Sequence, residues 1–272
     1  MLTPGVRKVV GFDKYPVHRW VDGRFVTDHD LLADESLVHV VVNERRITSL
    51  LASNADLVDL GVGHLATEYV DNPTNIATDP SVRNVGLETT VNVRVDVDTS
   101  SWISRDRLVT TSCGACEQDG VPGMLATARS VDPSSTPLSM ATLEAAFDSM
   151  REKQHGFHAT GGLHAAGLLY DTHHVEVRED IGRHNAVDKV IGAHLLQGQS
   201  SRPLALLLSG RCGWDIVAKA SKINIPLIAS IGAASSLATQ AARESNITLV
   251  SFMRKEQAVV IGPLHGRLQE KD

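Results

Sequence analysis

Two cysteines three positions apart are the most reactive pair in this sequence. Cys113 and Cys116 lie in the segment Thr111-Ser112-Cys113-Gly114-Ala115-Cys116-Glu117, and the chain has three cysteines in all. A thiolate is a strong nucleophile near neutral pH, and a second thiol nearby can attack whatever the first one carries. The same spacing suits half of a zinc site. The pair therefore predicts sulfur chemistry or metal binding, against the alternative of two small buried residues.

A zinc site would need ligands beyond this pair. A structural site takes about four ligands, and the sequence has no second C-x-x-C, so Cys212 and a histidine would have to complete it. A zinc-dependent nucleobase deaminase carries H-x-E before P-C-x-x-C. Here His174-Val175-Glu176 follows the cysteine pair, and no proline precedes Cys113. This order disfavours a deaminase-type hydrolase, and a thioredoxin-like role is disfavoured because the pair does not open a helix after the first strand of a redox fold.

A second group of candidates surrounds the start of a predicted helix. The segment from Glu179 to Lys189 is dense in polar residues, and its other face is apolar. Asp180 can cap the helix, and His184 can pair with Asp188 because the two are i, i+4 neighbours. Arg183 adds a cation. The plain alternative is a solvated helix start, which does not need so rich a cluster.

Three further segments could bind a ligand. The turn Ser209-Gly210-Arg211-Cys212-Gly213 separates an apolar strand from a helix that begins at Asp215, so helix amides could bind an anion there. We interpret Cys212 as a packing residue of that turn. Arg254 and Lys255 are adjacent cations after another strand and could meet phosphates. His164 follows two glycines and could be a base or a ligand, although its spacing favours a core histidine.

Strands and helices alternate in the second half of the chain and must position these residues. The apolar pattern predicts strands at 175–177, 204–208, 226–229 and 248–252 and helices beginning at Ser139, Arg183, Asp215 and Ser235. This alternation predicts an α/β fold with a largely parallel sheet. The first half predicts a strand that runs into a turn at 37–47, with the turn at Asn43-Glu44, and strands at 85–97 and 107–111. It also predicts a leading strand and loop up to Tyr15 and a helix at 56–70 broken by two glycines. The polar segment Ser130–Ser139 contains two prolines and indicates a linker, so we predict two parts, residues 1–130 and 131–272.

The whole composition narrows the class of protein. The 272 residues are 42% hydrophobic, which excludes a mainly disordered chain, and the formal charge of −6 disfavours nucleic acid as a partner. Three cysteines do not make a disulfide framework, so we expect a reducing, cytoplasmic location. The N-terminus lacks the apolar run of a signal peptide, and no stretch is long enough to predict a membrane span.

Several of these segments together resemble the FdhD family of formate dehydrogenase accessory proteins, which are sulfur carriers. The resemblance rests on segments spread over residues 105–255, listed here in chain order: Thr111–Cys116, Thr160–Ala166, Arg178–Gly192, Ser209–Arg211 and Ile225–Phe252. It implies a C-terminal part with cytidine deaminase-like α/β layers, beside a smaller mixed β/α N-terminal part that ends in the C-x-x-C loop. It also implies a homodimer.

The resemblance implies a function as well. Family members accept sulfur from a cysteine desulfurase as a persulfide and pass it to the molybdenum or tungsten bis-guanine-dinucleotide cofactor of formate dehydrogenase. Cys113 would carry the persulfide, with Cys116 as its partner and no bound metal. The residues implied or considered for cofactor binding are Phe252, Met253, Arg254, Lys255, Glu256, Gln257, Gly210 and Arg211. Residues that could support the site are His164, Asp180, Arg183 and His184.

The sequence departs from the family pattern next to the cysteine pair, and two other functions are possible. Glu117 stands where the family usually has glycine, and a carboxylate there disfavours a nearby thiolate. A cofactor-binding chaperone that transfers no sulfur is the main alternative function, and a zinc-dependent hydrolase is a further one.

Overall fold

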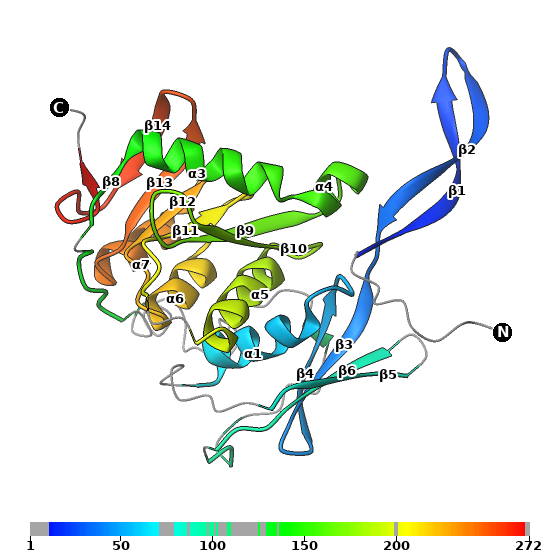
Figure 1. Ribbon diagram of the computed structural model, residues 1–272, viewed down its shortest axis with the longest axis horizontal. Helices are drawn as coiled ribbons and strands as arrows, with labels where there is room; N and C mark the ends of the chain where they lie inside the picture. The colour runs from blue at the N-terminus through cyan, green and yellow to red at the C-terminus, as the bar shows by residue number, and fades with distance from the viewer. Residues whose placement is uncertain are drawn as a thin grey trace.

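The computed structural model describes residues 11–70, 79–85, 88–96, 98–100, 102, 108–109, 125, 129–134, 136–198 and 201–269. These residues form stacked layers (Figure 1). A pair of helices covers one face of a six-stranded sheet, and three helices cover the other face. A further helix separates those three from a five-stranded sheet. None of the helices in the described ranges is long and apolar enough to cross a bilayer.

The N-terminal sheet has the strand order β5-β6-β3-β4-β7. Its elements are β3 (Ser36–Val42), β4 (Arg45–Ala52), β5 (Ser81–Val85), β6 (Glu88–Val93), β7 (Leu108–Val109) and the covering helix α1 (Leu57–Glu68). The expected turn at Asn43-Glu44 joins β3 to β4, with both residues at positive φ. The alternation predicted for 85–97 is confirmed over β6, where Thr89, Val91 and Val93 face the core.

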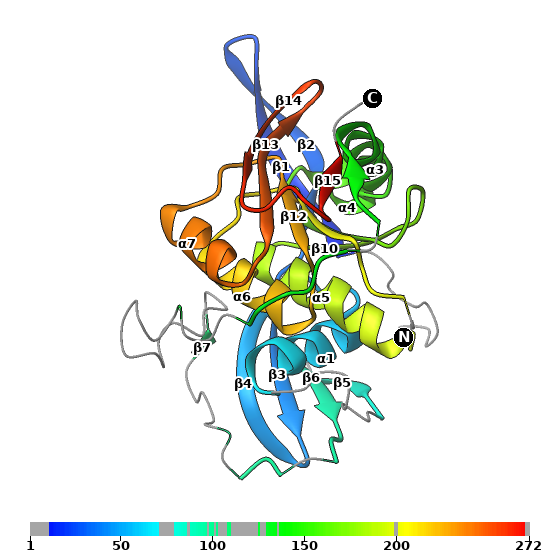
Figure 2. The same ribbon diagram turned by 90° about the vertical axis from the view of Figure 1, so that its left-hand side faces the viewer.

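A β-hairpin precedes this sheet and projects from the body of the molecule (Figures 1 and 2). Strands β1 (Phe12–Val21) and β2 (Arg24–Ala33) pair in antiparallel register around Asp22-Gly23. Both turn residues have positive φ, as a two-residue hairpin turn requires. The expectation of a strand and loop up to Tyr15 was therefore incomplete. Its strands show little apolar alternation because much of the ribbon is exposed.

The C-terminal sheet has the strand order β10-β9-β11-β12-β13-β14. Its strands are β9 (His164–Leu169), β10 (Val175–Asp180), β11 (Ala205–Leu208), β12 (Leu227–Ser230), β13 (Thr248–Arg254) and β14 (Gln257–Ile261). Only β11, β12 and β13 run parallel to one another, whereas β9, β10 and β14 pair in antiparallel register. The prediction of a largely parallel sheet was thus right for the centre and wrong for the flanking hairpins.

Helices bury both faces of this sheet. They are α3 (Met140–Glu152), α4 (His155–Thr160), α5 (Arg183–Leu196), α6 (Trp214–Lys222) and α7 (Ser236–Glu244), and β8 (Leu138–Ser139) pairs with β15 (Leu268–Gln269) beside them. Ser139 caps α3 by accepting a hydrogen bond from the Thr142 amide, as predicted. One apolar core lies under α3, and another lies between the sheet and α5 to α7.

The α/β class is confirmed, whereas the kinship of the C-terminal part with cytidine deaminases and the domain boundary at 130/131 stay predictions. Each sheet is built from one side of that boundary. The two sides meet where α1 packs against α5 (Figure 2).

Two glycines let α1 and α5 touch backbone to backbone. A Cβ atom on Gly63 would lie 1.8 Å from the carbonyl oxygen of Asp188, and one on Gly192 would lie 1.9 Å from that of Asp59. The prediction that glycines break the first helix was wrong, because α1 runs unbroken through Gly61 and Gly63. Glycine in a helix lowers stability through its conformational entropy, and here the close packing of the two helices offsets that loss.

Candidate functional site

One edge of the C-terminal sheet collects most of the predicted site residues. Strands β11, β12 and β13 end at this edge, β9 begins there, and β10 ends there before α5. Loops after parallel strands commonly form binding sites in α/β folds. We call this region the strand-end site, and it comprises His164, Asp180, Arg183, His184, Gly210 and Arg211.

Backbone contacts connect the strand-end site to the loop after β13. The Gly232 amide donates to the Gly210 carbonyl at 3.1 Å, and the Phe252 amide donates to the Gly232 carbonyl at 3.1 Å. A Cβ atom on Gly232 would lie 2.8 Å from the Gly210 carbonyl oxygen, so only glycine fits between these loops. The predicted Gly210 and Phe252 segments therefore lie on either side of one shared loop.

Basic side chains dominate the strand-end site, although the chain as a whole is acidic. His164 is half-buried, and burial lowers its pKa, helped by repulsion from Arg183, His184 and Arg211 and opposed in part by Asp180. The Nε atom of Arg183 is buried and has no hydrogen-bond partner among the described residues. Unpaired cationic donors of this kind favour an anionic ligand.

His184 pairs with a residue that the sequence analysis did not select. Its Nε2 atom faces the Oδ2 atom of Asp215, which lies in the first turn of α6. Burial raises the pKa of Asp215, but the contact with His184, together with the charges of Lys219 and Arg183, outweighs that effect and lowers the pKa. The predicted pairing of His184 with Asp188 was wrong, because each of the two side chains has other partners.

Asp188 instead lies in a buried network between α1, α5 and α6. Its carboxylate accepts from Thr67 Oγ1 at 2.9 Å and from Lys219 Nζ at 2.8 Å, and it pairs with His64 Nδ1 at 3.0 Å. Burial alone would raise the pKa of Asp188, but Lys219 and His64 lower it to about 2. Lys219 also pairs with Glu68 at 2.7 Å. The network joins the N-terminal and C-terminal parts.

Asp180 is fully buried and contacts residues of β4 and α5 next to the strand-end site. Gly182, not Asp180, is the N-cap residue of α5, but the Asp180 carboxylate accepts a hydrogen bond from the Gly182 amide at 2.8 Å, so the predicted capping role of Asp180 was right only in part. The Asp180 carboxylate pairs with Lys189 Nζ at 2.7 Å and accepts from the Ser53 amide at 3.1 Å. It also accepts from the side-chain amide of Asn185 at 3.0 Å. It therefore fixes the end of β4 against the start of α5.

The segment from Phe252 to Gln257 comprises the end of β13, the Lys255-Glu256 turn and the first residue of β14. Phe252 has a positive φ and is 47% exposed, whereas Met253 is 5% exposed and packs in the apolar core. Arg254 is exposed, and the Lys255-Glu256 turn is fixed by a hydrogen bond from the Glu256 amide to Glu144. The segment thus exposes the Phe252 ring and the cations Arg254 and Lys255 to a possible ligand, whereas Met253 packs in the core.

The two predicted catalytic cysteines, Cys113 and Cys116, lie outside the described residues, as does Glu117. Cys212 is described: it is 2% exposed within the core, and burial together with the Asp215 charge raises its thiol pKa far above the usual range. These observations agree with a packing role for Cys212. Within the described ranges no three His, Cys, Asp or Glu side chains form a metal-ligand cluster.

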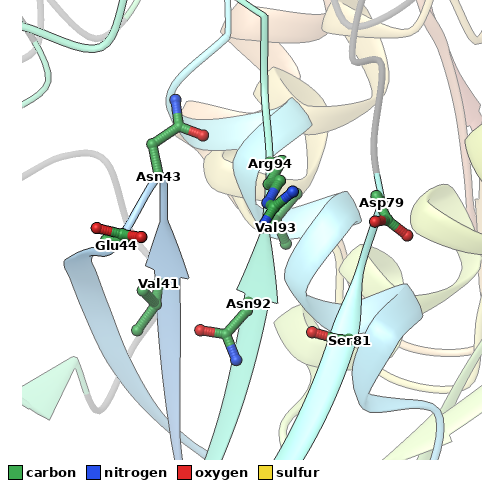
Figure 3. A pocket seen from close by; sticks show the side chains of 8 residues that line it. All are labelled: Val41, Asn43, Glu44, Asp79, Ser81, Asn92, Val93 and Arg94. Atoms are coloured by element: carbon green, nitrogen blue, oxygen red, sulfur yellow. The ribbon is translucent and has the colours of Figure 1, made fainter.

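A polar cavity of about 510 Å³ lies elsewhere, at the ends of β3 and β6 (Figure 3). Its lining residues are Val41, Asn43, Glu44, Asp79, Ser81, Asn92, Val93 and Arg94. None of the predicted site residues lies in it. The cavity belongs to the N-terminal sheet and is separate from the strand-end site.

Sequence reasoning missed Asp215 and Gly232 at the strand-end site. A signal for Gly232 was present, because Ser230-Ile231-Gly232 follows an apolar strand and precedes a helix, as Ser209-Gly210 does. Asp215 was noted only as a helix start. Its pairing with His184 depends on how α5 and α6 pack, which residue spacing does not reveal.

The chain is similar in sequence to known proteins over most of its length. The chain is 35% identical over 259 residues to a sulfur carrier protein FdhD of Streptomyces avermitilis, which covers 89% of this chain and 90% of that protein. It is 32% identical to the protein of the same name from Picrophilus torridus, over 87% of this chain and 90% of that protein.

A solved structure agrees with the fold. A protein described as a formate dehydrogenase accessory protein from Desulfotalea psychrophila aligns with a TM-score of 0.72 and 24% identity, over 94% of this chain and 99% of that one. The FdhD/NarQ family model matches residues 33–263, which include every residue of the strand-end site. The chain belongs to the FdhD/NarQ family.

Proposed function

We propose that this protein is a sulfur carrier that serves the maturation of formate dehydrogenase. It takes sulfur as a persulfide on Cys113 and passes it to a pyranopterin guanine-dinucleotide cofactor of molybdenum or tungsten, which is its substrate. Support comes from membership in the family and from the names of relatives that share most of the chain.

The direction of β7 is the observation that carries this proposal. Val109 pairs with Leu50 in parallel register, so the chain leaves β7 in the direction that β4 takes toward Ser53. The Ser53 hydroxyl accepts a hydrogen bond from the Ile181 amide at 3.1 Å, just before α5 begins. Cys113 is four residues beyond Val109, a reach of at most roughly 14 Å for an extended chain. We therefore propose that the Cys113 thiol acts at the strand-end site.

The chemistry of the strand-end site suits a large anionic substrate. Arg183 and Arg211 provide cations, and the glycine contacts at Gly210 and Gly232 leave backbone close to the surface. The α6 N-terminus at Gly213 has no side-chain cap, so its amides add to the positive potential. Arg254 and Lys255 at the β13–β14 turn extend the cationic edge.

Sulfur transfer then follows from thiol chemistry. The Cys113 thiolate attacks the outer sulfur of a donor persulfide, and the donor leaves as a thiolate. Cys116 attacks the inner sulfur of the loaded Cys113, which releases hydrosulfide and closes a disulfide between the two residues. A dithiol reductant must supply two electrons to reopen that disulfide before the next cycle.

Sulfur carriage requires a donor and a client protein. The sulfur donor is a cysteine desulfurase, and the client is formate dehydrogenase. We also propose that the protein acts as a homodimer in the cytoplasm, where its thiols stay reduced.

Complementation tests the proposal. In a strain that lacks its own copy of this gene, the wild-type chain should restore formate dehydrogenase activity, and Cys113→Ala should not. Cys212→Ala is the matched control and should restore activity, because that thiol is buried in the apolar core and packs there. Full activity with Cys113→Ala would refute sulfur carriage and favour a cofactor chaperone. Stoichiometric zinc bound through Cys113 and Cys116 would instead favour a hydrolase.

A further inference from the structure

A serine, a histidine and a glutamate meet on the N-terminal sheet, away from the strand-end site. The Nδ1 atom of His39 lies 2.8 Å from the hydroxyl oxygen of Ser49, and its Nε2 atom lies 3.3 Å from a carboxylate oxygen of Glu88. The three residues come from the neighbouring strands β4, β3 and β6. A nucleophile, a base and a group that orients the base are connected in this way in enzymes that act through a serine.

The three side chains lie on the face of this sheet that is turned away from α1, which we call the outer face (Figure 1). Val38 and Val40, on either side of His39, are fully buried in the core shared with α1, so His39 points the other way. The burial pattern of β6 places Glu88 on the outer face too. Ser49 pairs with His39 across the sheet, shares its face and is half-buried.

The two contacts of His39 determine where its proton lies. A carboxylate can only accept, so Nε2 carries the proton and donates it toward Glu88. In a neutral imidazole Nδ1 then has a lone pair, and the Ser49 hydroxyl donates to it. Glu88 is 61% exposed and gains little stability from the contact, whereas it does orient the imidazole. The Ser49 oxygen therefore faces a base that can take its proton.

A cation and a cavity lie one cross-strand pair further along the same face. Arg46 is exposed and pairs with Val41, two residues beyond His39 on β3. Val41 and Asn92 line the cavity of Figure 3, which thus begins roughly 7 Å along the strand from His39. Because the sheet uses strand amides, a side chain has to stabilise the charge that develops on a carbonyl oxygen, and Arg46 carries the matching charge.

We propose that Ser49 is a nucleophile that cleaves small carboxylic esters, with His39 as its base and Glu88 as the positioning residue for His39. The Ser49 oxygen bonds to the carbonyl carbon while its proton passes to Nδ1. The carbonyl oxygen becomes negatively charged near Arg46, and its return to a carbonyl expels the alcohol, which takes the proton from Nδ1. Water then attacks the acyl-serine by the same route and releases the acid. The reaction uses no group of the strand-end site.

A fluorophosphonate probe tests the nucleophile in the full-length protein. The serine oxygen bonds to phosphorus and fluoride leaves, so the intact mass rises and peptide mapping locates the label. The wild-type protein should carry the label on Ser49. His39→Gln should slow labelling at least about a hundredfold, and Glu88→Gln about tenfold at an unchanged half-saturating probe concentration. A wild-type protein that takes no label, or takes it on another serine, would overturn the inference.

Two controls keep structural damage apart from a chemical role. Ser36 lies on the same sheet, and its hydroxyl donates to the Ala52 carbonyl at 3.4 Å instead of to a histidine. Ser36→Ala should therefore be labelled at the wild-type rate. Imidazole added to His39→Ala should restore part of the labelling rate, which lost packing would not allow. A folded His39→Gln variant that is labelled as fast as the wild type would refute the role of His39.

Hydrolysis of nitrophenyl acetate tests the complete reaction. Cys113→Ala and Cys116→Ala are combined in the parent protein so that thiols do not contribute to the rate. Adding Ser49→Ala should reduce hydrolysis to the rate in buffer, and an equal rate with and without Ser49 would refute ester cleavage. Neither assay involves sulfur, so a protein that fails to carry sulfur can still be labelled at Ser49.

Discussion

Two successive turns of α5 carry charged side chains in opposite circumstances. In the second turn, Asp188 is fully buried and is matched by Lys219, His64 and Thr67. In the first turn, His184 pairs with Asp215, but Arg183 has a buried Nε atom without a partner in the described part of the chain. Burying a charge is costly unless it is paired. The second turn, called the paired turn here, joins the N-terminal and C-terminal parts of the molecule. The first turn, called the unpaired turn because of the Arg183 Nε atom, is suited to bind an anion.

The largest effect should come from breaking the paired turn. Lys219→Met leaves Asp188 and Glu68 without their cation, so the free energy of unfolding should fall by about 3–5 kcal/mol. Urea denaturation measures it. Arg151→Met removes an exposed pair with Asp148 on α3 and should change stability by less than about 1 kcal/mol. Equal effects from the two variants would contradict the assigned role of the network.

The glycine contact between α1 and α5 should rank next. Gly63→Ala places a methyl group against the Asp188 carbonyl, so the two helices must separate or bend. We expect a loss of roughly 1–3 kcal/mol in unfolding free energy. Thermal melting measures it, and an unchanged melting temperature would show that the helices do not pack this closely.

Acid should weaken the paired turn in a defined pH range. The pKa of Asp188 is about 2 in the folded protein and 3.8 for the unperturbed group. A lowered carboxylate pKa means that stability is fully present above about pH 4 and is lost as pH falls toward 2. Unfolding free energies measured between pH 5 and pH 2 should therefore fall. Asp188→Asn should show a smaller slope, and an identical slope would assign the acid sensitivity to other groups.

The smallest effect on stability should come from the unpaired turn. Arg183→Met removes no hydrogen bond of its Nε atom within the described residues, so stability should change by less than about 1 kcal/mol. Binding of pyrophosphate, measured by calorimetry, should weaken by about tenfold, since a charged hydrogen bond contributes roughly 1.5–3 kcal/mol. Unchanged pyrophosphate binding would place the anion elsewhere.

Much of the fold could be predicted from local patterns. Apolar strands such as 204–208 and the cap at Ser139 depend on nearby residues, and both were predicted correctly. The β1–β2 hairpin was missed because its exposed strands lack a buried face. The prediction that Gly63 breaks the helix was wrong because the glycine is needed for close contact with α5 near Gly192, which is far along the chain.

The candidate site was predicted in part, for the same reason. His164, Arg183 and Gly210 gather at one edge because strand order brings them there, and their residue types suggested function before the order was known. The partners of His184 and Asp188 could not be predicted, since i, i+4 spacing offered a local pairing that packing against α6 replaced. Long-range pairing is decided by tertiary structure.

The central claim is that Cys113 carries sulfur, and intact mass measurement tests it most directly. After incubation with a cysteine desulfurase and cysteine, the wild-type protein should gain the mass of one sulfur atom, and a thiol reductant should remove it. Cys113→Ala should gain none, whereas Cys212→Ala should gain as much as the wild type. A sulfur adduct of equal size on Cys113→Ala, or none on the wild type, would contradict the account.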